Sequence, residues 1–346
     1  MDYFTLSKDL SFVLMVGFIM VSAGLAKEFK LFAPAVSLIQ DTVKNNRLVI
    51  ILISAIGGVL PIEGRVVVSA GFLDSISLPT KNREKLGIID FISTHHYYLW
   101  SPLEKTVILP IAAFGFSYVD WIKLILPILT ISFLYIGWYI WTNIHNDDVH
   151  IPDVKFNIWE LLTQSFPMVA AIGLYIYGID KLICFGLLTV YYIGLTKHFN
   201  VLKYINWNLL LIVASVIILG NFIKLHSAEL EEFIKTAPVN MYSIYGFISI
   251  SVFAFMFSFF TGSSGKFIAM AIILSQLFGH EYFLWFFTLE YAAYLVSPTH
   301  KCVAVGNQYF GTSISTYYNA LITWGVLLTL TTGLLTYLNY YEIFNF

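Results

Sequence analysis

Two short polar stretches interrupt apolar segments at corresponding places in the chain. The one in the middle of apolar segment 283–312 consists of Ser297, Pro298, Thr299, His300 and Lys301. A charged group at the centre of a bilayer costs about 2.5–3.5 kcal/mol on insertion scales and usually marks the path of a substrate or an ion. Proline also removes a backbone donor, so nearby carbonyls need another partner. This stretch is therefore the first candidate for a binding site.

The other polar stretch lies in apolar segment 86–115 and consists of Ser101, Pro102, Leu103, Glu104 and Lys105. Both stretches begin with Ser-Pro and end with lysine, and a tyrosine stands three residues before each, Tyr98 in one case and Tyr294 in the other. The shared pattern indicates an internal duplication. It predicts two helices, each broken near the middle of the membrane.

Two glycine-containing tips join pairs of short apolar runs upstream of the broken helices. The first tip, in predicted hairpin 47–77, contains Pro61, Glu63, Gly64 and Arg65. The second, in predicted hairpin 241–279, consists of Thr261, Gly262, Ser263, Ser264, Gly265 and Lys266. Each tip carries a glycine followed by a cation. The pattern predicts re-entrant hairpins, whose irregular backbone is tolerated at membrane depth only under a cover of protein or water.

These residue types favour an anion as the bound solute. Helix N-termini at the tips and breaks present free N–H groups and a positive dipole end, and both attract anions. Serine and threonine hydroxyls orient an oxyanion, while Arg65, Lys105, Lys266 and Lys301 add positive charge. The competing interpretation is internal pairing, Glu63 with Arg65 and Glu104 with Lys105, or snorkelling of a lysine to the interface.

Protonatable groups at the breaks suggest coupling to protons. Glu104 and His300 occupy equivalent positions in the two copies and form the first candidate pair, because both can titrate near neutral pH in a membrane interior. His95, His96, Asp74, Asp90 and Glu290 are further candidates. Asn307 is a candidate for binding either the solute or the unwound backbone.

Composition sets the class of protein. Of 346 residues, 58% are hydrophobic and only 12% are charged, and apolar runs of about 20 residues recur along the chain. The expected fold is an all-α polytopic membrane protein, with the lipid bilayer as its surroundings. The sequence holds two cysteines, no CxxC or HExxH pattern and no basic tract. We therefore expect no metal, no cofactor beyond a coupling ion (H⁺ or Na⁺), and no nucleic-acid partner.

The pattern divides the chain into three parts: repeat 1 over 1–145, a central two-span linker over 146–200, and repeat 2 over 201–346. Each repeat contains a span, a hairpin, a broken helix and a further span. This count gives about eight crossings and places the second repeat in the membrane with inverted topology, a signature of secondary transporters.

Basic residues orient the protein. One face collects Lys27, Lys30, Lys44, Arg47, Lys81, Arg83, Lys85, Lys155, Lys197 and Lys203. By the positive-inside rule this face is cytoplasmic. The prediction is a multi-pass protein of the cytoplasmic membrane with both termini on the outer side.

The inverted order of span, hairpin, Ser-Pro-broken helix and span resembles the ion-transporter superfamily of anion permeases and antiporters. Within it, the chain looks most similar to the uncharacterised domain of unknown function 401 family. The matching residues are Pro61 to Gly64, Gly262 to Gly265, and Ser297 to His300 with Asn307, Tyr309 and Phe310 downstream.

This resemblance implies a mobile domain made of the hairpins and broken helices. The domain would move as an elevator against a scaffold that is often dimeric. The bound solute would lie where both tips and both breaks converge. One departure affects the coupling ion, because sodium-coupled relatives have neutral tips whereas Arg65 and Lys266 place cations here. Proton coupling or exchange is therefore favoured over sodium coupling.

The sequence-based expectation is a secondary active transporter for a small, anionic solute, and not an enzyme. One alternative is a rhomboid-like intramembrane serine protease, because residues 262–265 fit Gly-x-Ser-Gly and His280 or His300 could activate Ser264. Another is a cation/proton exchanger with the same fold. A channel and a non-transporting receptor also remain open.

Overall fold

The protein is entirely helical over the residues that the structure describes. A computed structural model describes residues 3–59, 69–70, 73, 83–145, 155–208, 210–211, 214–215, 218, 222, 229, 232, 243–300, 302–303 and 309–338. The first part of the chain comprises α1 (Tyr3–Glu28), α2 (Ala33–Thr42), α3 (Asn46–Val59), α5 (Arg83–His95), α6 (Tyr97–Trp100), α7 (Lys105–Phe114) and α8 (Tyr118–Asn143). The middle comprises α9 (Ile158–Glu160), η2 (Leu161–Ser165), α10 (Phe166–Tyr177), α11 (Lys181–Thr196) and η3 (Val201–Tyr204). The last part comprises α14 (Ile244–Thr261), α15 (Ser264–Phe278), η4 (His280–Tyr282), α16 (Phe283–Leu295) and α18 (Ile314–Tyr337).

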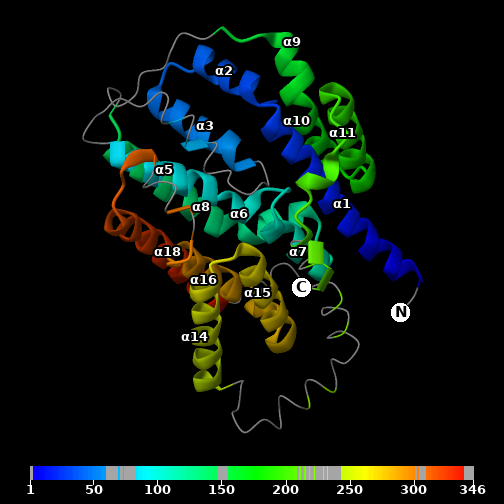
Figure 1. The fold of residues 1–346 in the computed structure, drawn as a ribbon. Coiled ribbons are helices and arrows are strands. Elements are labelled where there is room, and N and C mark those ends of the chain that lie inside the picture. Colours follow the sequence, from blue (N-terminus) through cyan, green and yellow to red (C-terminus); the bar gives the residue numbers. More distant parts are fainter. Residues whose placement is uncertain are drawn as a thin grey trace.

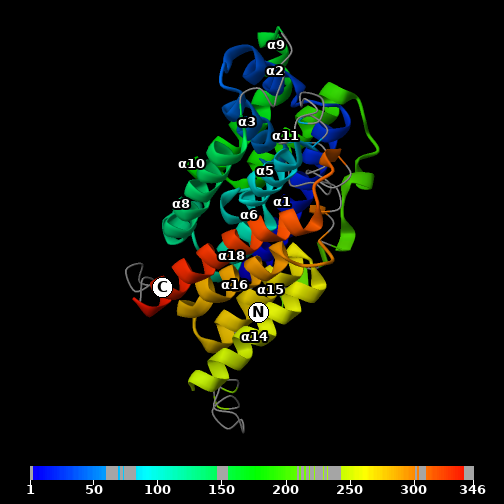
Figure 2. The same cartoon turned by 90° about the vertical axis from the view of Figure 1, so that its left-hand side faces the viewer.

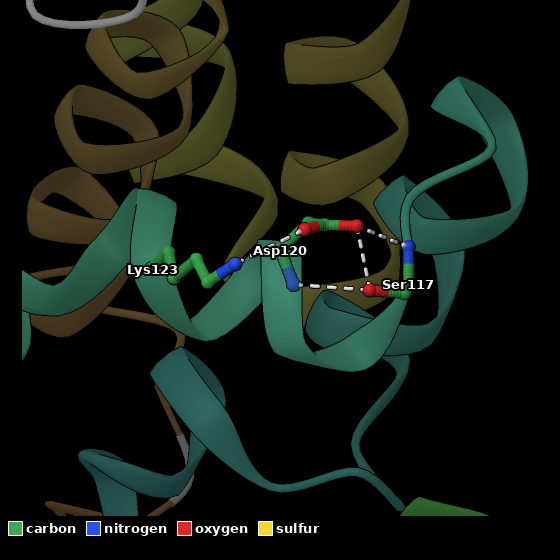
Figure 3. Close-up of polar contacts among 3 residues, drawn as sticks. All are labelled: Ser117, Asp120 and Lys123. Atoms are coloured by element: carbon green, nitrogen blue, oxygen red, sulfur yellow. Dashed lines mark hydrogen bonds and ion pairs between the residues drawn. The ribbon is translucent and has the colours of Figure 1, made fainter. Parts of the chain in front are cut away.

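Serine side chains set the start of the longest helices after α1. Ser117 accepts a hydrogen bond from the backbone N–H of Asp120, and the Asp120 carboxylate accepts bonds from Ser117 in return (Figure 3). This capping box supplies partners for backbone donors that a helix start leaves unpaired. Ser243 and Ser313 cap α14 and α18 in the same way, through one hydrogen bond each.

The helices identify a membrane protein. Among the described residues, α8, α14 and α18 are both long enough and apolar enough to cross a bilayer. The 18 residues of α14 extend about 27 Å at 1.5 Å per residue. Large apolar side chains are exposed along these helices, including Leu134 on α8 (65% exposed) and Leu330 on α18 (66% exposed). Such surfaces suit lipid and are costly in water.

The first predicted broken helix is described in full and the second as far as its first arm and its break. The helix expected over 86–115 consists of α5, α6 and α7, and its helical conformation is lost between Trp100 and Lys105, where Ser101 and Pro102 stand. The helix expected over 283–312 begins as α16, which ends at Leu295, two residues before Ser297, and most of its second arm lies outside the described residues. Proline explains both breaks because it lacks the N–H of the helical ladder and disfavours a helical conformation for the residue before it.

The second predicted hairpin is a helix-turn-helix in which Gly262 joins α14 to α15. Gly262 adopts a left-handed conformation (φ +50°), which glycine reaches without strain. At about 27 Å, α14 is longer than the half-length helix expected for a re-entrant arm. The first hairpin is represented by α3, whereas its tip and most of its return arm lie outside the described residues.

Most other sequence-based boundaries agree with the helices to within a few residues. The first span, expected over 10–26, lies within α1, and the short helix expected over 31–43 is α2. The span expected over 157–177 is formed by α9, η2 and α10. Of the segments that restart the pattern, 207–222 is described at only half of its positions and 227–236 lies almost wholly outside the described residues. The division into repeats therefore remains a prediction.

The helices of the last part gather at one end of the molecule and interlock with the first broken helix. Figures 1 and 2 show α14, α15, α16 and α18 below α2, α3 and α11. Within this arrangement α16 packs against α14, α15 and α18, while α15 also contacts α7 and α18 contacts α8 and α5. On the other side, α1 packs against α11 and η3. The two broken helices thus lie at the centre of the molecule.

Candidate functional site

The first break is closed by side chains of the protein itself. The carbonyl of Tyr98 accepts a hydrogen bond from the Thr106 hydroxyl (2.5 Å), and that of Leu99 accepts one from Trp121 Nε1 (2.8 Å). The Trp100 carbonyl accepts a bond from the Tyr118 hydroxyl (2.7 Å). Carbonyls freed by a helix break must find partners in an apolar medium, and here α7 and α8 supply them. Ser101, Pro102, Leu103 and Glu104 are all buried.

The second break is more open. Ser297 donates from its hydroxyl to the Phe259 carbonyl (2.6 Å) and lies 2.9 Å from the Thr299 hydroxyl. Ser297 is buried, whereas Pro298 and Thr299 are exposed. This break therefore keeps polar groups at a surface, while the first break does not.

The tip of the second hairpin rests directly on the second break. A β-carbon at Gly262 would overlap the side-chain oxygens of Thr299 and Ser297, so this close approach requires glycine. Next to the contact, α15 begins at Ser264 with no side-chain cap, in contrast to the capped starts of α8, α14 and α18. Lys266 is exposed on the first turn of α15.

The two broken helices meet through hydrogen bonds between their polar side chains. The hydroxyls of Tyr98 and Tyr294 are 3.1 Å apart, and Tyr291 donates from its hydroxyl to the carbonyl of His95 (2.7 Å). His95 Nε2 and His300 Nε2 are 3.0 Å apart. All five side chains are buried. Residues that precede the first break and residues on both sides of the second are therefore parts of one cluster.

Two buried carboxyl groups tie a hairpin to the first arm of a broken helix. In the first part of the chain, Ser54 of α3 donates to Asp90 of α5 (3.2 Å). In the last part, Ser258 of α14 donates to Glu290 of α16 (2.7 Å). Buried carboxyl groups are retained where such partners exist, so each hairpin is fixed to its broken helix by a polar contact.

A protein family matches nearly the whole chain. Residues 5–340 match the family described as "Protein of unknown function (DUF401)". The chain belongs to this family. A search among curated proteins finds no match. The sequence-based resemblance to the DUF401 family is thus confirmed, and it carries no assigned activity with it.

In this DUF401 protein, three of the four predicted site segments lie together. The second tip contacts the second break at Gly262, and the first and second breaks share the Tyr98–Tyr294 and His95–His300 contacts. Among the predicted cations, Lys105 is half-buried and Lys266 exposed. The remaining predicted site residues lie outside the described residues: Pro61, Glu63, Gly64, Arg65, Lys301 and Asn307.

Several polar residues of the cluster had a weak signal in the sequence or none. From the sequence, His95 ranks below Glu104 as the predicted partner of His300, because Glu104 occupies the position in the first copy that is equivalent to His300. The structure joins His300 to His95, and the Sγ atom of Cys302 lies within 4.8 Å of their donor nitrogens. Tyr291 and Ser258 had no signal beyond their polarity. Their roles depend on how two distant segments cross, which local spacing does not encode.

Proposed function

We propose that this protein is a secondary active transporter that moves a small solute, most simply an anion, across the cytoplasmic membrane by alternating access. The observation that carries the proposal is the meeting of two helix breaks, from opposite ends of the chain, in one buried polar cluster beside a hairpin tip. Discontinuous helices that meet at the membrane centre are typical of transporter binding sites. A protein that only anchored other components would not need breaks of this kind.

The second break is the proposed place of the solute. Thr299 is exposed and lies against the tip at Gly262, α15 starts next to that tip without a side-chain cap, and Lys266 is exposed on the first turn of α15. Each of these groups favours an oxyanion, through hydrogen-bond donors, the helix dipole or charge. Arg65 and Lys301 are further candidates for the same role.

The proposed movement separates the hairpin tip from the break. The contact of Gly262 with Ser297 and Thr299 is the one that the bound solute would replace. We further propose an inverted repeat with re-entrant hairpins, membership of the ion-transporter superfamily, and elevator movement against a dimeric scaffold. The coupling ion proposed is the proton rather than Na⁺, and no other cofactor takes part.

The protease alternative receives little support from the geometry. Ser264 begins α15 and His280 follows its end, so the 15-residue helix separates them by about 22 Å. His300 already has both ring nitrogens within hydrogen-bond distance of other groups, the Tyr294 carbonyl and His95. A cation/proton exchanger with the same fold is the more serious competitor, and the following experiment distinguishes it.

The test is the thermal stability of the purified protein with citrate, sulfate, phosphate or arsenite, with and without sodium, at two pH values. A ligand at a hundredfold excess over its Kd raises the unfolding free energy by about 2.7 kcal/mol. We expect one anion class to stabilise the wild type. The stabilisation should be lost in Thr299→Val and Lys266→Ala but kept in Lys123→Ala, an exposed lysine at the start of α8.

A response to sodium and to none of the anions would favour the cation/proton exchanger. If all four anions leave the melting temperature unchanged while sodium alone raises it, the protein is a cation exchanger and the anion proposal is wrong.

A further inference from the structure

The His95 and His300 rings are each held by a backbone carbonyl. His95 Nδ1 lies 2.7 Å from the carbonyl oxygen of Phe91, and His300 Nδ1 lies 3.0 Å from that of Tyr294. A carbonyl oxygen only accepts hydrogen bonds, so each Nδ1 must carry a proton and donate it. The Thr94 hydroxyl, 3.2 Å from His95 Nδ1, is itself directed to the carbonyls of Asp90 and Phe91 and does not change this assignment.

Because both Nδ1 atoms carry a proton, the protonation state of the two Nε2 atoms is restricted. A neutral imidazole has one N–H and one bare nitrogen. If both histidines were neutral, two bare Nε2 atoms would face each other at 3.0 Å with their lone pairs opposed. The arrangement is stable only when something positive lies between them.

We infer that His95 and His300 bind one additional proton and share it between their Nε2 atoms. The proton is taken up from the aqueous solution and adds one positive charge to the pair. It forms an N–H···N hydrogen bond with a nitrogen–nitrogen distance of 3.0 Å, within the ordinary range. The alternative is a metal ion held by the two nitrogens and the Cys302 thiolate. Two nitrogens at about 2.0–2.1 Å from a tetrahedral zinc would stand about 3.3–3.4 Å apart. The observed separation fits the proton better.

The surroundings suit a buried cation made of imidazole rings. His95 and His300 are 0% and 5% exposed, so water does not compete for the shared proton. The Phe91 ring is stacked on His95 at 3.8 Å, and the Tyr294 ring lies 4.3 Å from His300. Aromatic faces at such distances stabilise a cation.

Titratable groups surround the pair on every neighbouring element. Tyr98 from α6 and Tyr291 and Tyr294 from α16 contact the histidines, and Cys302 lies beside them. The buried carboxyl groups on the described parts of the two broken helices are those of Asp90, Glu104 and Glu290, whereas Glu84 at the start of α5 is exposed. The Asp90 and Glu290 carboxyl groups accept hydrogen bonds from Ser54 and Ser258.

The shared proton connects the two parts of the chain. His95 ends the first arm of one broken helix, and His300 follows the break of the other. Removing the proton leaves opposed lone pairs, so the two helices can stay in this arrangement only while the proton is bound. On the basis of the proposed function, this proton is the one whose movement is coupled to the solute.

The direct test is nuclear magnetic resonance of the full-length protein with ¹⁵N-labelled histidine, at neutral pH after removal of metals. We expect a scalar coupling between two Nε2 nitrogens through one proton, with both Nδ1 nitrogens protonated. The coupling should vanish in His300→Gln and His95→Gln and persist in His280→Gln, a histidine that contacts Phe114 outside the cluster. It should also persist in Cys302→Ser.

Two results would overturn the inference. One is the absence of the coupling in the wild type, with each Nε2 exchanging independently with water. The other is one equivalent of zinc bound on addition of Zn²⁺ alone and lost in Cys302→Ser, with the coupling absent before the metal is added. The coupling in the wild type decides the first result without any variant. In the second, the zinc bound by the wild type and the coupling before the metal is added decide the outcome, and Cys302→Ser serves only to locate the zinc.

A second measurement separates the coupling role from the proposed transport. Proteoliposomes containing a pH-sensitive dye are exposed to a gradient of each anion of the stability screen. If the wild type moves an anion with protons, His300→Gln should reduce proton movement at least tenfold. Unchanged proton movement in His300→Gln would make the shared proton structural. An absence of anion movement in the wild type would contradict the proposed function and leave the shared proton standing.

Discussion

At the scale of single residues, the hydrogen bond between Tyr98 and Tyr294 is the simplest sign that the breaks converge. Their spacing from the two Ser-Pro pairs predicted a relationship, and the structure places their hydroxyls 3.1 Å apart. Neither tyrosine is at a break. Substituting them therefore tests the crossing of the two helices without changing the residues proposed to bind the solute.

Replacing Tyr98 and Tyr294 with phenylalanine, singly and together, should measure the interaction energy of this hydrogen bond. Each single variant should lose about 0.5–1.5 kcal/mol of unfolding free energy, the usual worth of a hydrogen bond, and the double variant should lose less than the sum. The measurement is a double-mutant cycle by denaturation in detergent. Combining Tyr98→Phe with Tyr245→Phe, whose side chain is 80% exposed on α14, should give additive effects. Additivity in the Tyr98–Tyr294 cycle itself would contradict the contact.

Residue-level prediction from sequence worked where the duplication repeated a residue and not elsewhere. Tyr98, Ser101, Tyr294 and Ser297 are found by comparing the two copies. His95 is not, because it lies three residues before Tyr98, and the residue three positions before Tyr294 in the second copy is Tyr291. The His95–His300 contact arises from an asymmetric crossing of the helices, so symmetry pointed to Glu104 instead.

At the scale of elements, the second hairpin and the second broken helix depend on one glycine. Gly262→Ala should be destabilising for two reasons, because φ is +50° and because the β-carbon would meet Thr299 and Ser297. Gly115→Ala is a matched control, since Gly115 has φ +75° but open space around its β-carbon position. We expect Gly262→Ala to cost about 1–3 kcal/mol more than Gly115→Ala, because strain and an unrelieved clash each carry a cost of this order.

Thermal or chemical denaturation of both variants measures this difference. Equal losses in the two variants would mean that the backbone conformation alone matters, and that the tip does not press on the break.

The start of α8 gives an element-scale prediction that is independent of the site. Ser117→Ala removes the capping box and should lower the unfolding free energy by about 0.5–2 kcal/mol. Ser117→Asn keeps a side-chain oxygen at the cap and should restore most of the loss. The same denaturation assay checks both variants, and a neutral effect of Ser117→Ala would show that α8 is fixed by packing alone.

Elements were the part of the fold that could best be predicted from sequence. Apolar runs predicted α8, α11 and α18 closely, and the two Ser-Pro pairs predicted the breaks. The length of α14 was harder to interpret, because hydropathy does not distinguish a helix that crosses the membrane from one that enters and turns back. That distinction depends on what covers the helix in three dimensions.

At the scale of the whole molecule, the distribution of basic residues predicts both termini on the outer side. A phosphatase that folds only outside the cytoplasm should be active when fused after Phe346, and a fluorescent protein that folds only inside should stay dark there. Fusions within 146–150, assigned by the prediction to the cytoplasmic side, should give the reverse. Fluorescence at the C-terminus would contradict the predicted topology and the inverted repeat that rests on it.

The two breaks differ in how completely the protein supplies partners for their polar groups, and on the predicted duplication this difference gives the two copies different roles. Thr106, Tyr118 and Trp121 hold the carbonyls of the first break, so that copy behaves as the fixed support of the pair. The second copy keeps Pro298 and Thr299 exposed under a glycine tip and retains the freedom to adapt. On the proposed function, changes in solute preference among relatives should accumulate around the second break. A library intended to alter selectivity should vary 261–266 and 297–299 while leaving 98–106 untouched.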